Sequence, residues 1–177
     1  MGSFIIHQPT IGRNGGQKIL EDRNHEYKIV ISESKDEDFS NLIALLDADL
    51  EQRYGAIQQE YKKHNKVDYI KDVVLIYSGS SAVACGAFKE FDGSTVEIKR
   101  VFVMKEFRKQ GLAGKILKNL EQLAQDKGYK FCVLETGVKQ HEAIGLYKKH
   151  GYEIIDNYGP YVGMENSICM KKELCNE

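Results

Sequence analysis

The 177-residue sequence predicts an α/β domain in which a mixed β-sheet carries helices on both faces. Short segments of alternating, β-branched residues are interleaved with segments whose apolar residues recur every three to four positions. The length suits one domain with a sizeable core, and no repeat or interdomain linker divides it. We therefore predict a single domain over residues 27–177.

The first 26 residues differ from the rest because they lack a sustained period. Pro9, Gly12 and Gly16 interrupt any regular element there, so we predict a flexible N-terminal extension over residues 1–26. Within it, the apolar residues 4–6 could add an edge strand to the sheet.

Strand and helix patterns then follow in a regular order. A strand is predicted at Tyr27–Ser32, and Ser34 with Glu37 forms a capping-box pattern before a helix. The apolar face of that helix consists of Phe39, Leu42, Ile43, Leu46 and Leu50. After a kink, a second helix is predicted over residues 53–64.

The elements downstream of position 71 are predicted from period and turn signals. A hairpin-type turn at 78–80 separates two strands, and Asp92-Gly93 turns into a third. The predicted elements are strands at 72–77, 82–91 and 96–103, a helix from 111 to 127, a strand at 131–135, a helix at 140–149, and strands at 152–155 and 167–172.

The stretch from position 96 to 120 predicts a strand, a basic turn and a helix. Strict alternation places Val96, Ile98, Arg100 and Phe102 on one face of the strand and Glu97, Lys99, Val101 and Val103 on the other. From Gly111 the period is helical, with an apolar face of Leu112, Ile116, Leu117, Leu120, Leu123 and Ala124. Lys127 and Gly128 are typical of a helix end.

The turn that follows the strand has the features of an anion site. A helix start offers N–H groups without helical partners and the positive end of the helix dipole. Gly111, Ala113 and Gly114 have little or no side chain, so a phosphate could approach the backbone closely. Arg108 and Lys109 add positive charge. The turn is therefore predicted to bind a pyrophosphate; the Walker A and dinucleotide-binding patterns are both absent from it.

Two motifs carry a resemblance to a known family. Arg108-x-x-Gly111-x-Ala113 matches an R/Q-x-x-G-x-G/A motif, and residues 140–152 are similar to an N-x-x-A-x-x-L-Y-x-x-x-G-F segment. Both motifs, in this order, are those of the GNAT superfamily of N-acetyltransferases, which this chain resembles.

The resemblance is close over residues 94–157, loose over 28–92 and 158–174, and absent before them. It implies the acyl-CoA N-acyltransferase fold, in which the sheet splays apart between the strands at 96–103 and 131–135. It also implies acetyl-CoA as the co-substrate.

By resemblance, three groups of residues bind acetyl-CoA. The residues expected to bind the pyrophosphate are Arg108, Lys109, Gln110, Gly111, Leu112, Ala113 and Gly114. The pantetheine arm pairs like an added strand with the backbone of Val101, Phe102 and Val103, and one of their N–H groups polarises the thioester carbonyl. Gln140 takes the position of the family's usual Asn and keeps its amide, with one more methylene.

Two residues are expected to move protons. Tyr147 matches the tyrosine that family members use as general acid toward the thiolate, and a phenol of pKa about 10 can protonate a thiolate of pKa about 8.5. The alternative for Tyr147 is a packing role. Glu97 is the first candidate for general base, because apolar neighbours could raise its pKa; the alternative is an exposed residue paired with Lys99. Glu135, on the facing strand, is the second candidate.

The acceptor site is expected between the helices at 37–64 and the loop at 156–166. The residues that could attract a cationic amine are Asp47, Asp49 and Glu51, and those that could form its apolar part are Tyr54, Tyr158 and Tyr161. The alternative is a solvated helix face with ordinary loop aromatics.

Composition narrows the partners. The formal net charge is −1 with interleaved signs, so no nucleic-acid partner is expected. The apolar runs are too short to span a membrane, and His and Cys show no metal-ligand spacing, so no metal is expected. Cys85 and Cys132 are predicted buried strand thiols. With no signal peptide recognised, a cytoplasmic location is predicted.

These observations predict an acetyl-CoA-dependent N-acetyltransferase. Its acceptor is expected to be the primary amine of a small or amino-acid-like molecule, which attacks directly in a ternary complex. One alternative is a protein acetyltransferase that acts on an α-amine or a lysine, and another is a non-catalytic acyl-CoA-binding sensor. A homodimer is left open, because dimers are common in the superfamily.

Overall fold

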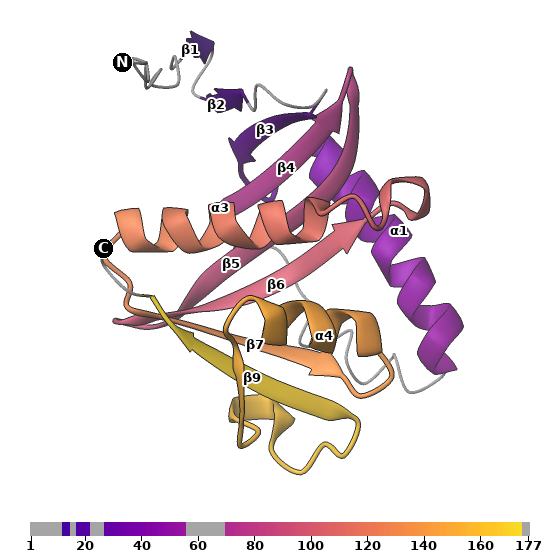
Figure 1. Cartoon of the computed structure of the whole chain (residues 1–177), viewed down its shortest axis with the longest axis vertical. Coiled ribbons are helices and arrows are strands. Elements are labelled where there is room, and N and C mark those ends of the chain that lie inside the picture. Colours follow the sequence, from indigo (N-terminus) through magenta and orange to yellow (C-terminus); the bar gives the residue numbers. More distant parts are fainter. Residues whose placement is uncertain (1–11, 15–16, 22–26, 56–69, 175–177) are drawn as a thin grey trace, which may run out of the picture.

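The computed structural model describes residues 12–14, 17–21, 27–55 and 70–174 of the chain. Their centre is a nine-stranded sheet of order β1-β2-β3-β4-β5-β6-β7-β9-β8 (Figure 1). The strands are β1 (Gly12–Asn14), β2 (Gln17–Glu21), β3 (Tyr27–Ser32), β4 (Asp72–Ser78), β5 (Ser81–Asp92), β6 (Thr95–Val103), β7 (Phe131–Gly137), β8 (Glu153–Ile155) and β9 (Ser167–Glu173).

The sheet is mixed, as predicted. Its strands pair antiparallel throughout, apart from β6 and β7, which pair parallel. A parallel pair needs a crossover connection, and the helix α3 (Leu112–Asp126) supplies it here. The helical elements are α1 (Glu37–Tyr54), η2 (Lys105–Phe107), α3 (Leu112–Asp126), α4 (His141–Lys149) and η3 (Gly159–Tyr161).

Helices cover both faces of the sheet, which confirms the predicted fold class. The helices α3 and α4 lie across one face and α1 across the other (Figure 1). The α3 side is packed with Leu112, Ile116, Leu117, Leu120, Ala124 and Tyr147 over Val74, Val96, Ile98 and Leu134. The α1 side is packed with Phe39, Leu42, Ile43 and Leu46 over Val73, Leu75, Cys85 and Phe102.

The start of α1 corrects the predicted capping box. The N-cap is Asp36 rather than Ser34, because its Oδ1 accepts the backbone N–H groups of Asp38 at 2.9 Å and Phe39 at 3.3 Å. A side-chain acceptor at this position satisfies donors that have no helical partner. The Ser32 hydroxyl donates to the other carboxylate oxygen at 2.5 Å and so fixes the cap.

Two short strands, β1 and β2, precede β3 where the sequence predicted no regular element. β2 pairs antiparallel with β3, with Ile19 opposite Val30, and β1 pairs with β2. The edge strand suggested at residues 4–6 lies outside the described residues, as does most of the second helix suggested at 53–64. The flexibility of residues 1–26 stays a prediction.

A β-bulge in β6 overturns the strict alternation predicted for that strand. The register with β5 runs Ala87↔Lys99 and then Cys85↔Phe102, so β6 has one residue more than its partner over this interval. Arg100 takes a positive φ of 59° there, and such an extra residue shifts the strand's phase. Phe102 is therefore buried against α1, on the opposite face from Val96 and Ile98, which pack under α3.

The bulge faces Gly86 of β5, and α3 packs directly over that glycine. A Cβ built on Gly86 would overlap Ile116 Cγ2 and approach Leu120 Cδ1 to 3.0 Å. The close approach of α3 to the sheet therefore depends on the missing side chain at this position.

We expect Gly86→Ala to destabilise the fold by about 1–3 kcal/mol, the usual cost of overpacking a core. The measurement is urea unfolding of the variant beside wild type. Gly93→Ala is the matched control, because a Cβ at Gly93 would have no neighbour within 4 Å. Equal unfolding midpoints for the two variants would contradict the packing argument.

Candidate active site

The gap between β6 and β7 is the feature around which the site is built. These strands pair only from Thr95↔Phe131 to Ile98↔Leu134. Beyond that point each strand pairs only along its outer edge: β6 continues to pair with β5, and β7 continues to pair with β9. Their inner edges therefore diverge, and the splay predicted between these two strands is present.

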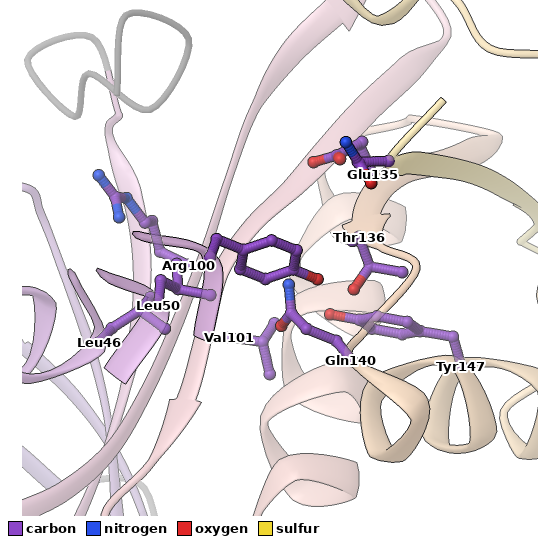
Figure 2. A pocket seen from close by; sticks show the side chains of 11 residues that line it. Leu46, Leu50, Arg100, Val101, Glu135, Thr136, Gln140 and Tyr147 are labelled. Atoms are coloured by element: carbon purple, nitrogen blue, oxygen red, sulfur yellow. The ribbon is translucent and has the colours of Figure 1, made fainter. Parts of the chain in front are cut away.

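A pocket occupies the splay. It is lined by Leu46, Leu50, Tyr54, Arg100, Val101, Glu135, Thr136, Gly137, Gln140, Tyr147 and Asn166. Figure 2 shows Thr136, Gln140 and Tyr147 on one side and Leu46, Leu50 and Arg100 on the other, with Val101 between them. The pocket thus joins the α4 side of the sheet to the α1 side.

The start of α3 lies at the end of β6 and offers free backbone donors. Gly111, its N-cap, has φ 79°, and no side chain caps the helix. Lys115 donates to the Gly111 carbonyl at 3.1 Å, which is the first bond of the helix. The N–H groups of the residues between them, 112–114, precede the helical bonding pattern. This geometry fits an anion such as a pyrophosphate.

The side chains of the turn mainly hold it in place. Arg108 Nε donates to the Val103 carbonyl at 3.0 Å, and its guanidinium lies 3.6 Å from the Asp49 carboxylate. Gln110 accepts the Tyr27 hydroxyl at 2.5 Å. The Arg108 charge is therefore directed at β6 and α1, whereas the sequence had suggested that it simply adds to the anion site.

Tyr147 of α4 presents its hydroxyl to the pocket. Burial raises the pKa of its phenol, and the nearby Glu135 carboxylate raises it further. The hydroxyl makes no hydrogen bond to another described residue, so its proton is available to a ligand in the splay (Figure 2). Tyr147 also packs edge-on against Tyr152, with ring centroids 5.8 Å apart. Tyr147 can therefore pack against Tyr152 and still present its hydroxyl proton to a ligand.

Glu97 differs from the prediction in two ways. It is buried, 3% exposed, but it is not among the residues that line the pocket. Although burial acts to raise its pKa, the Lys99 and Lys89 ammonium groups outweigh burial, so the pKa of Glu97 lies below its usual value. The expectation of a raised pKa was wrong, because the neighbours are charged rather than apolar.

The contacts of Glu97 use both carboxylate oxygens. Oε1 accepts the hydroxyls of Tyr158 and Tyr161, each at 3.2 Å, and lies 3.4 Å from Lys99 Nζ. Oε2 lies 3.1 Å from Lys89 Nζ. The carboxylate therefore anchors the loop before β9 to the sheet.

Glu135 of β7 combines the properties expected of a base in this site. It lines the pocket beside Tyr147. Burial raises its pKa, and Glu97 adds to the rise, while a hydrogen bond from the Ser167 hydroxyl at 2.7 Å and the charge of Lys99 oppose it. The site thus contains a protonated phenol and a carboxyl whose pKa is shifted toward neutrality.

Comparison with known proteins decides the family. Residues 30–152 match the family model "Acetyltransferase (GNAT) family". The chain belongs to this family. It is an acetyl-CoA-dependent N-acetyltransferase with the acyl-CoA N-acyltransferase fold.

Relatives and solved structures agree with this assignment. The chain is 35% identical over 106 residues to an IAA acetyltransferase of Azospirillum brasilense, which covers 59% of this chain and 69% of that protein. A Klebsiella pneumoniae structure named as an acyl-CoA N-acyltransferase is 32% identical, has a TM-score of 0.71, and covers 84% of this chain and 98% of its own. A GNAT structure from Elizabethkingia anophelis with acetyl-CoA bound shares the fold, with 24% identity, a TM-score of 0.53, and coverage of 68% and 83%.

Of the residues that the sequence suggested for the acceptor site, only some line the pocket. Tyr54 lines it, whereas Tyr158 and Tyr161 bond to Glu97. Asp47 lies 2.6 Å from Arg100, and Asp49 pairs with Arg53 and Arg108. These two aspartates are therefore used to hold α1 against the sheet.

Some pocket residues carried no signal in the sequence. Arg100 turns toward Asp47 only because of the bulge, and Thr136 and Asn166 reach the pocket through the β7–β9 pairing. Gly137 is needed because a Cβ there would overlap the Tyr54 hydroxyl. These positions depend on contacts between distant parts of the chain, which a periodic pattern does not contain.

The described part of the chain holds no group of three or more His, Cys, Asp or Glu residues placed to bind a metal ion. None of its helices is long and apolar enough to cross a membrane.

Proposed function

We propose that the protein transfers the acetyl group of acetyl-CoA to the primary amine of a small or amino-acid-like molecule, by direct attack in a ternary complex. One observation carries the proposal: a single pocket crosses the splayed sheet and places the Tyr147 phenol and the Glu135 carboxyl on its wall. An acid and a base with separated pKa values are what transfer between a thioester and an amine requires.

The residues that would hold acetyl-CoA fit its chemistry. The backbone donors at the start of α3, residues 111–114, suit the pyrophosphate. The inner edge of β6 over residues 101–103 has no partner strand. Apart from the Val103 carbonyl, which accepts Arg108 Nε, its backbone can therefore pair with the pantetheine amides. An N–H group there would polarise the thioester carbonyl. Gln140, in the pocket wall, can hydrogen-bond the same arm.

Proton movements complete the reaction. The amine loses a proton to the base and its nitrogen forms a bond to the acetyl carbon, while the carbon–sulfur bond breaks. The leaving sulfur takes the proton of the Tyr147 hydroxyl, and the protonated base then returns its proton through solvent to the Tyr147 phenolate, so both groups end as they began. Burial raises the pKa of Tyr147, so this phenol is protonated at neutral pH. The same rise makes it a weaker acid, so the proton passes only as negative charge develops on the sulfur beside it.

Two carboxyls compete for the role of base. Glu135 lines the pocket and has a raised pKa, whereas Glu97 is held by two lysines and two tyrosines and has a lowered pKa. A general base is most effective when its pKa lies near the working pH. We therefore propose Glu135 as the base, with Glu97 as the alternative.

The pH dependence of kcat/KM should separate these two. In the wild type it should fall as the pH drops through the pKa of Glu135, which lies above the usual carboxyl value, because protonation removes the base. Glu135→Gln should abolish this acidic limb and lower kcat/KM by about 100-fold or more near neutral pH. Glu97→Gln should keep the limb. The opposite result, a limb lost only in Glu97→Gln, would assign the base to Glu97.

The acceptor class is supported by the pocket wall and by a relative's name. The α1 side of the pocket is apolar at Leu46 and Leu50, which suits the carbon skeleton of a small amine. The relative of Azospirillum brasilense is named for a small-molecule acceptor. We therefore favour a small amine over a protein α-amine or lysine. Buried free thiols at Cys85, Cys132 and Cys169 are compatible with the cytoplasmic location that we propose.

A screen of amines and peptides that follows release of free CoA tests the proposed function. Release with small amines, and not with peptides, is the expected result. Release with peptides alone would assign a protein substrate. Acetyl-CoA binding without release in the presence of any acceptor would favour the sensor alternative.

A further inference from the structure

Tyr54 closes the α1 side of the pocket. It is the last residue of α1 and lies four residues after Leu50 and eight after Leu46, so that the three side chains share one face of the helix. All three line the pocket. Tyr54 is only 8% exposed although it ends its helix.

Tyr54 is held in place from the opposite wall. Its hydroxyl accepts the backbone N–H of Lys139 at 3.1 Å and a hydrogen bond from the Gln140 side chain. It lies so close to Gly137 that a Cβ there would overlap it. The preceding residue, Arg53, forms an ion pair with Glu142 of α4. Two links therefore join the end of α1 to the opposite wall, one to the segment between β7 and α4 and one to the first turn of α4.

The direction of the acyl chain follows from the proposed function, on which this inference rests. There the sulfur lies by Tyr147 and the carbonyl oxygen by the β6 backbone. The third substituent of the thioester carbon must point away from both, toward the wall on the α1 side. The methyl of an acetyl group is small enough to fit there, whereas a longer chain would meet the fixed ring of Tyr54.

We propose that Tyr54 is a specificity-determining residue, whose ring limits the acyl donor to acetyl-CoA and excludes longer acyl-CoA thioesters. The limit is imposed by the volume of the ring and its rigid anchoring. The hydroxyl acts only as the anchor, so removing it should matter less than removing the ring.

Affinity for two acyl-CoA thioesters tests this proposal without depending on turnover. Butyryl-CoA has two methylenes more than acetyl-CoA, and one methylene in a tight pocket is worth about 10–200-fold. By calorimetry, the wild type should therefore bind acetyl-CoA at least about 10-fold more tightly than butyryl-CoA. In Tyr54→Ala the ratio should fall to about 2-fold or less. Tyr54→Phe should keep most of the wild-type ratio.

Two further variants serve as a back-up and as a control for this test. Tyr54→Leu keeps an apolar side chain in case the alanine variant does not fold, and it should also lower the ratio. Gln52→Ala is the matched control, because Gln52 is exposed on the same helix and does not line the pocket; its ratio should equal that of wild type. Circular dichroism checks that each variant is folded.

The outcomes separate the inference from the proposed function. A wild-type ratio near one, or an unchanged ratio in folded Tyr54→Ala or Tyr54→Leu, overturns the role of Tyr54. A ratio that falls as expected, in a protein that releases no CoA with any acceptor, supports the role of Tyr54 and overturns only the proposed transfer.

Discussion

Replacing Gly111 with glutamate is expected to weaken acetyl-CoA binding about 100-fold, because a carboxylate beside a pyrophosphate costs several kcal/mol. Gly111 caps α3 in the left-handed region, at φ 79°, next to the helical N–H groups that have no intrahelical acceptor. A Cβ at this position would meet no protein atom within 4 Å. The added side chain would therefore extend into the space where the phosphates should bind, and calorimetry with acetyl-CoA measures the loss.

The backbone conformation requires a control for Gly111→Glu. A non-glycine residue at positive φ costs about 1–3 kcal/mol of stability. Asparagine tolerates the left-handed region better than most residues and carries no charge. Gly111→Asn should therefore bind acetyl-CoA within a few-fold of wild type. Near-normal affinity in a folded Gly111→Glu variant would place the pyrophosphate elsewhere.

Tyr147→Phe is expected to lower kcat by about 10- to 1,000-fold while acetyl-CoA affinity stays nearly unchanged. The substitution keeps the ring and its edge-on contact with Tyr152, but it removes the proton that the thiolate would take. Because burial raises the pKa of Tyr147, the phenol remains protonated at neutral and mildly alkaline pH. The loss of kcat should therefore be the same across that range, which steady-state kinetics at several pH values would show.

The control for Tyr147→Phe is Tyr129→Phe. The Tyr129 hydroxyl bonds to Glu90 at 3.2 Å, and Tyr129 does not line the pocket. Loss of the Tyr129 hydroxyl should leave kcat unchanged. If Tyr147→Phe had wild-type kcat, a pre-steady-state burst of CoA release would show that product release limits turnover. Without such a burst, the thiolate would leave unprotonated and the general-acid role of Tyr147 would be wrong.

The sequence was informative where a property depends on nearby residues. The order of elements from β3 to β9 and the strand–turn–helix at 96–120 were predicted from period and turn residues. The anion-binding turn that we predict also rests on local features, because Gly111 can adopt a positive φ and begins a helix. Tyr147 came from the motif at residues 140–152, which contains the helix α4. Each of these features can be recognised from a short stretch of sequence, by its period, its turn residues or its motif.

The sequence failed where a single residue changes the register. The bulge at Arg100 has no local signature, since neither glycine nor a turn residue marks it. It moves Phe102 to the α1 face and places Arg100 by Asp47. Similarly, the short strand β2 has no periodic pattern and is defined by its pairing with β3.

From the sequence alone we determined the fold class and the family motifs, and we predicted a phosphate-binding turn and a phenol as parts of the site. Only the tertiary structure distinguished the two carboxyls that were candidates for the base. Glu97 and Glu135 look alike in the sequence, as acidic residues in neighbouring strands, but their pKa values shift in opposite directions. The reason is that Glu97 is surrounded by charges from β5 and β6, whereas burial outweighs the charges near Glu135. These charges and this burial come from residues that are far apart in the chain, and only folding brings those residues together.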